Sequence, residues 1–90
     1  MKKDSYIERI LVLSTAHMPE TSPDFGSIAV IEYNYGYILT SISPDYIENL
    51  ALVIPDWIKP ILKFSSKQKA HMLMFDRDGN EEPDLKTYDW

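Results

Sequence analysis

The sequence predicts one α+β domain with two layers, in which one or two helices cover one face of a four-stranded mixed sheet. The chain has 90 residues, which is enough for a single core, so residues 1–90 are expected to form one domain. Runs of β-forming residues occur in the first half and again near the end, and helical spacing occurs between them. The expected order of elements is therefore β-β-β-α-α-β.

The first expected element is a strand over residues 7–14. Residues 10–13 read Ile-Leu-Val-Leu, a continuous apolar run that favours a strand buried on both faces. Residues 14–17, Ser-Thr-Ala-His, then turn the chain. Two prolines and a glycine indicate that residues 18–27 form a loop with at most one helical turn.

A β-hairpin is expected next. Residues 28–33 and 37–42 are rich in β-branched and aromatic side chains. Asn34, Tyr35 and Gly36 lie between them, and three residues ending in glycine are typical of a type I turn followed by a left-handed glycine bulge. The pattern predicts a positive φ at Gly36.

Two helices are expected between the hairpin and the last strand. The first runs over residues 43–54, because Ser43 suits the N-cap, Pro44 suits the first helical position, and Pro55 closes it. The second begins near Pro60, with Asp56 or Lys59 as its cap. Its expected apolar side consists of Ile58, Ile61, Leu62 and Phe64, and its solvated side of Lys59, Lys63 and Lys67.

The last expected strand covers residues 71–75. Met72 and Met74 share one of its faces, and we expect this face to belong to the core. The helical connection permits a parallel pairing with the first strand. The sequence Asp76-Arg77-Asp78-Gly79 predicts a turn. The acidic tail, residues 80–90, contains three large apolar residues and is expected to fold back onto the domain; they are Leu85, Tyr88 and Trp90.

The composition excludes several classes of protein. There is no cysteine, so disulfides and zinc–thiolate sites are excluded. No stretch is long and apolar enough to be a targeting segment or to span a membrane, and a cytoplasmic location is expected. The net charge of −5 argues against direct binding of nucleic acid. Residues 57–75 carry four lysines and no acid, whereas residues 76–90 carry six acids and two bases, a polarity that suits a protein partner.

Four segments together resemble a known family: Ser14 to His17 after a strand, Tyr35 to Tyr37 in a hairpin, Phe75 to Gly79, and Thr87 to Trp90 at the end. In this order they are similar to a family of small uncharacterised bacterial proteins, a domain of unknown function. The resemblance implies carriage on plasmids and prophages, near anti-restriction and toxin–antitoxin genes. It implies no catalytic residue.

A polar cluster is expected at one edge of the sheet. If the first and last strands are parallel, Ser14, His17, Asp76 and Asp78 all follow strand ends at that edge, where open sheets bind ligands. Such a set suits a hydrolase or a small-ligand binder, but no G-x-S-x-G motif is present, and turn-stabilising roles explain the same residues. The segment after Phe75 lacks the spacing of a calcium loop. No metal or cofactor is expected.

The leading hypothesis is a non-enzymatic protein-interaction module of a mobile genetic element. Its specific form is an inhibitor of a host defence system, such as restriction or CRISPR interference, that presents acidic side chains to a site built for phosphates. The candidate contact residues are Asp78, Glu81, Glu82 and Asp84. The alternative is the ligand binder or hydrolase at the sheet edge.

Overall fold

A four-stranded mixed sheet with helical segments on one face forms the domain, which confirms the predicted α+β class. The computed structural model describes residues 7–42 and 53–89. The order across the sheet is β1-β4-β3-β2; β1 and β4 are parallel and the other neighbours are antiparallel. The elements are β1 (Ile10–Ser14), η2 (Thr15–His17), β2 (Val30–Tyr33), β3 (Gly36–Leu39), η3 (Asp56–Ile58), α2 (Lys59–Lys67) and β4 (Met72–Asp76).

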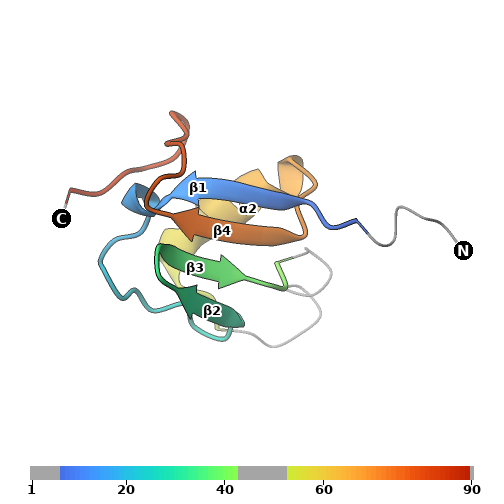
Figure 1. Cartoon of the computed structure of the whole chain (residues 1–90), viewed down its shortest axis with the longest axis horizontal. Helices are drawn as coiled ribbons and strands as arrows, with labels where there is room; N and C mark the ends of the chain where they lie inside the picture. The colour runs from blue at the N-terminus through green and yellow to red at the C-terminus, as the bar shows by residue number, and fades with distance from the viewer. Residues whose placement is uncertain (1–6, 43–52, 90) are drawn as a thin grey trace, which may run out of the picture.

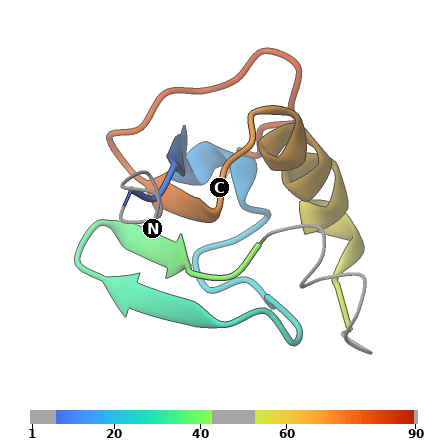
Figure 2. The same ribbon diagram turned by 90° about the vertical axis from the view of Figure 1, so that its right-hand side faces the viewer.

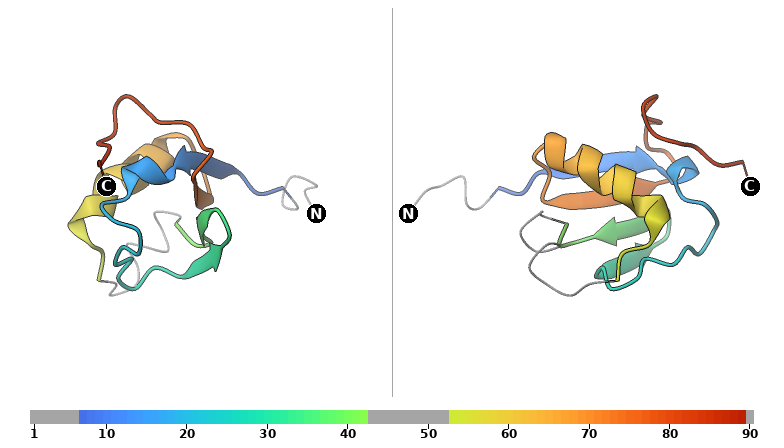
Figure 3. Two further views of the ribbon diagram at one scale, coloured as in Figure 1. Left: turned by 60° about the vertical axis from the view of Figure 1, so that its left-hand side comes forward. Right: turned by 180° about the vertical axis from the view of Figure 1, so that it is seen from behind.

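The helix α2 lies behind the sheet in Figure 1 and in front of it in the reverse view of Figure 3, and Figure 2 shows the two layers edge-on. The core fills the space between them and includes Leu13, Phe25, Leu39, Ile58, Ile61, Leu73 and Phe75. Aromatic rings extend this core toward η3. The centroid of the Phe25 ring is 5.2 Å from that of Tyr37 and 5.6 Å from that of Trp57. These contacts fix the long loop before β2 against the helical layer.

The prediction that β1 is buried on both faces is wrong. Leu13 is buried and Leu11 half-buried on the side of α2, but Ile10 and Val12 point to the other side and are each 44% exposed. The apolar run is continuous, yet no described segment covers the face that carries Ile10 and Val12. We call this uncovered side of the sheet the open face.

The prediction that Met72 and Met74 belong to the core is also wrong. Leu73 and Phe75 are the fully buried side chains of β4, and the two methionines are half-buried on the open face. The two-residue repeat of a strand correctly places the methionines on one face and Leu73 and Phe75 on the other, but both faces of β4 are apolar. Periodicity therefore did not decide which pair faces the helix.

The hairpin exists, but its turn differs from the predicted one. Tyr33 and Gly36 are directly paired, so the loop has two residues, Asn34 and Tyr35, and contains no glycine bulge. Gly36 has a φ of 159°, positive as predicted but close to extended. Glycine is required here for space, because a Cβ at this position would lie 1.7 Å from the backbone oxygen of Phe75 on β4.

The predicted helix over residues 43–54 falls outside the described residues, apart from Val53 and Ile54, which are not helical. The second helix is confirmed, with Pro60 in its first turn. Its predicted cap is wrong: Ile58 occupies the N-cap and makes no side-chain cap hydrogen bond. The 3-10 turn η3 immediately precedes α2, and Asp56 in this turn forms an ion pair with Lys59 at 2.8 Å.

The tail folds back onto the domain, as predicted. Leu85 is buried and Tyr88 is half-buried, whereas Trp90 lies outside the described residues. The tail crosses the end of β1 and continues toward the helical layer (Figures 1 and 2). In the part of the chain that the structure describes, no helix is long and apolar enough to cross a membrane.

Candidate functional site

The parallel pairing of β1 and β4 brings the predicted polar residues to one edge of the sheet. Ser14 and Asp76 are register partners at the ends of the two strands. His17 follows in η2, and Asp78 follows in the turn after β4. The expected gathering at one edge is therefore confirmed. The side chains of Ser14, His17 and Asp76 nevertheless hydrogen-bond to different groups.

Ser14 caps the turn that follows it. Its Oγ accepts a hydrogen bond from the backbone N–H of Ala16 at 3.0 Å, which is the N-cap bond of η2. Its own backbone N–H donates to the carbonyl oxygen of Asn80 at 2.9 Å. Both contacts stabilise the chain reversal at the end of β1, and neither directs the hydroxyl toward His17.

His17 holds the tail in place. Its ring is fully buried, its Nε2 accepts from the backbone N–H of Glu82 at 2.9 Å, and its Nδ1 lies 2.8 Å from the carbonyl oxygen of Lys86. A backbone N–H can only donate, so Nε2 is the acceptor, Nδ1 carries the proton, and the ring is neutral. Tyr88 adds a backbone hydrogen bond to Ala16 at 2.7 Å. Both ring nitrogens are thus occupied by the backbone, which leaves no base for a nearby nucleophile.

Asp76 makes a cross-sheet contact that the sequence did not reveal. The hydroxyl of Tyr33, on β2, donates to Oδ2 of Asp76 at 2.5 Å, and the N–H of Asp78 donates to Oδ1 at 2.8 Å. Tyr33, Gly36 and Asp76 share one row across three strands, and the glycine leaves room for the ring to span the strand between them. The only sequence signal is a tyrosine next to a short turn with glycine at its far end.

The pKa values of Tyr33 and Asp76 move in opposite directions at this contact. Burial, the hydrogen bond to Asp76 and the charges of Asp76 and Asp78 raise the pKa of Tyr33 to about 12. The hydrogen bond from Tyr33, with that from the backbone of Asp78, lowers the pKa of Asp76. The pair is a fixed hydrogen bond between a protonated phenol and a carboxylate, not an activated nucleophile.

We expect Tyr33→Phe to raise the pKa of Asp76 toward the ordinary value, because the main group that favours the carboxylate is lost. A lowered folded-state pKa stabilises the fold above the unfolded pKa, and this contribution disappears as the pH falls through the folded one. The stability difference between wild type and variant should therefore shrink in acid. A carboxyl-carbon NMR titration measures the shift. Tyr35→Phe is the control, and an Asp76 titration identical in wild type and Tyr33→Phe would contradict the assignment.

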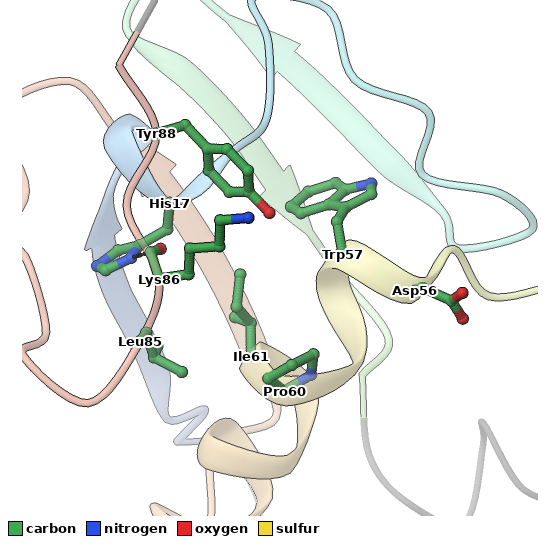
Figure 4. A pocket seen from close by; sticks show the side chains of 8 residues that line it. All are labelled: His17, Asp56, Trp57, Pro60, Ile61, Leu85, Lys86 and Tyr88. Carbon is green, nitrogen blue, oxygen red and sulfur yellow. Dashed lines mark hydrogen bonds between the residues drawn. The ribbon is translucent and has the colours of Figure 1, made fainter.

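A hollow of about 270 Å³ lies between the tail and the helical layer (Figure 4). Its lining is mostly apolar and consists of His17, Asp56, Trp57, Pro60, Ile61, Leu85, Lys86 and Tyr88. The hydroxyl of Tyr88 points toward the ring of Trp57 (Figure 4), and the ammonium of Lys86 lies 4.7 Å from the Tyr88 ring centroid. His17 contributes a wall and no free ring nitrogen. The hollow suits an apolar side chain better than a reaction that moves protons.

The predicted acidic contact residues lie in the turn after β4 and in the tail that follows it. Asp78, Glu81 and Asp84 are exposed, and Glu82 is half-buried because its backbone is bound to His17. Among the described residues, no three histidine or acidic side chains are grouped so that they could hold a metal ion. We call these four acids, on the turn after β4 and the anchored segment that follows it, the acidic strip.

Taken with its fold, the site defines a small α+β domain whose polar edge residues stabilise the tail and the turns. The family profile described as "Family of unknown function (DUF5983) C-terminal domain" matches residues 10–90, beginning at the first residue of β1. The chain belongs to this family of unknown function. No curated protein and no solved structure matches the chain.

Proposed function

We propose that this chain is a non-enzymatic protein-interaction module and that the open face of the sheet is its main contact surface. One observation carries the proposal: Val12, Met74, Ile38 and Ile31 are register partners and form an apolar row across all four strands. Val12 is 44% exposed and Ile31 55% exposed.

The open face combines apolar and acidic features. A second pair, Ile10 and Met72, continues the apolar surface beside the row, and burying such side chains contributes about 25 cal/mol per Å². Methionine side chains adapt to differently shaped partners. The neighbouring row carries Asp76, with Asp78 in the turn beyond it. We infer a partner that presents apolar side chains flanked by basic ones.

The narrower form of the proposal is an inhibitor of a nucleic-acid-directed host defence complex, encoded on a mobile element such as a plasmid or prophage in the bacterial cytoplasm. The acidic strip supports it, since Glu81 and Asp84 flank Glu82, whose backbone is anchored at His17, so this segment loses little backbone freedom on binding. Such a strip would occupy a basic groove. Its contribution should weaken as salt rises, because exposed charges are screened over about 8–10 Å.

The test is capture of partners from a bacterial lysate by the immobilised chain, followed by mass spectrometry. Ile31→Lys should reduce the captured partner at least tenfold, because a charge within the row must be desolvated on binding. Val53→Lys is the matched control, because Val53 is exposed and lies outside the sheet. Both variants should keep the wild-type melting temperature, since exposed substitutions usually change stability by under about 0.5 kcal/mol.

A third variant, Glu81→Lys with Glu82→Lys, separates the acidic strip from the apolar row. Loss of capture in this variant alone would replace the open face by the acidic strip as the contact. Loss in both it and Ile31→Lys supports a joint surface. Capture that survives both changes would show that the proposed surface is wrong.

A further inference from the structure

The outer edge of β1 carries unpaired backbone groups. Because the carbonyl of Arg9 accepts from the N–H of His71, residues 9, 11 and 13 face β4, and the backbone groups of Ile10 and Val12 face outward. The N–H of Ser14 also faces outward and donates to Asn80. Within residues 7–42 and 53–89, this is the only backbone hydrogen bond on that edge.

The two edge strands of the sheet differ in how well they are protected against pairing with another chain. The edge strand β2 carries Glu32 in its middle, and a charge there discourages pairing with another chain. The run from Ile10 to Leu13 on β1 contains no charged or proline residue. An apolar edge of this kind is a template for strand addition.

Space for another strand exists along β1. Two hollows of about 310 and 320 Å³ border this edge and share Leu11 and Gln68 in their linings. Phe64 of α2 adds an apolar wall to one of them. Arg9 lines the hollow at the start of β1, while Glu81 and Glu82 line the hollow at its end. The groove along β1 is therefore basic at one end and acidic at the other.

We propose that this edge pairs with β1 of a second copy of the chain, antiparallel and about a two-fold axis at Leu11. In this register Ile10 lies opposite Val12 of the second copy, and Val12 opposite its Ile10. Residues of both positions present N–H and C=O outward, so four backbone hydrogen bonds form symmetrically. The two Leu11 side chains meet on the side of α2.

Charge complementarity selects a second copy over an unrelated strand. In the antiparallel register, Arg9 of each copy lies beside Glu81 and Glu82 of the other, so the basic end meets the acidic end twice. Asn80 occupies the edge beyond Leu13 and ends the pairing there. About five residues per copy span roughly 17 Å, which is short of a standard interface, so the dimer should be weak and concentration-dependent.

Sedimentation equilibrium of the full chain tests the proposal. The mass should rise with concentration from 10.5 kDa toward twice that value. Val12→Pro should abolish this rise, because it removes an outward N–H that no described residue uses. Glu32→Pro, on the outer edge of β2, is the matched control and should still associate.

A charge exchange tests the register without altering the backbone. Arg9→Glu alone, and Glu81→Lys with Glu82→Lys alone, should each remain monomeric, whereas an equimolar mixture of the two variants should associate, because both ends are complementary again. A monomeric wild type at every concentration would overturn the proposal. So would association that survives in folded Val12→Pro, or a mixture that stays monomeric. Partner capture is a separate measurement from self-association, and its decisive variant, Ile31→Lys, lies on β2, away from the edge of β1.

Discussion

His17→Ala should lower the free energy of unfolding by about 3 kcal/mol and release the tail. The substitution removes a fully buried ring and leaves a cavity. It also leaves the N–H of Glu82 and the carbonyl of Lys86 without their partner, and such losses cost about 1–3 kcal/mol each when the groups stay buried. For a domain of this size, the melting temperature should fall by roughly 12–24 °C. Thermal unfolding followed by circular dichroism measures it.

Two conservative variants separate the hydrogen bonds from the packing. In His17→Asn the side-chain amide nitrogen can take the place of Nδ1 and donate to the carbonyl of Lys86. In His17→Gln the side-chain amide oxygen can take the place of Nε2 and accept from the N–H of Glu82. Each should lose less stability than His17→Ala. Amide hydrogen exchange at Glu82 and Tyr88 should accelerate most in the alanine variant. Unchanged exchange at both amides would show that His17 does not hold the tail.

Gly36→Ala should be at least as damaging. A methyl group at this position would lie 1.7 Å from the backbone oxygen of Phe75, and backbone in the centre of a sheet cannot move aside as a side chain can. We expect a loss of about 3 kcal/mol, at the upper end of the usual cost of overpacking. Denaturant unfolding provides the value.

Asn34→Ala, in the exposed turn of the same hairpin, is the control for a local effect of alanine. It should change stability by far less. Equal stability of Gly36→Ala and wild type would mean that β3 and β4 do not approach each other as closely as described.

The fold class followed from the sequence because each strand lies in a mainly apolar run and the reversals at residues 18–27, 34–36 and 76–79 contain turn residues. Which face of each strand is buried did not follow from the sequence. β1 and β4 are apolar on both sides, so alternation gave no contrast between Val12 and Leu13 or between Met74 and Phe75. Only the position of α2 distinguishes the core side from the open face. The same apolar excess that obscured this choice supplies the row that we propose as a contact surface.

The candidate site was foreseen in place but not in function. Parallel pairing of the first and last strands predicted that Ser14 and Asp76 would lie together. The partners of these residues are backbone groups and a tyrosine from a distant strand, and spacing along the chain contains no information about them. His17 illustrates this limit: its two hydrogen bonds go to residues 65 and 69 positions later.

The pairing of β1 with β4 also bears on how the chain folds. β1 leaves the ribosome before the hairpin and α2, whereas the strand beside it, β4, comes after them, so the contact of the two strands closes a long loop. Non-local parallel pairing slows folding, and the apolar segment from Ile10 to Leu13 stays unpaired until β4 has emerged. The hairpin and α2 contain mainly local contacts and can form first. Docking of β1 would then be a late event in folding, and until it occurs the apolar segment is open to pairing with other chains.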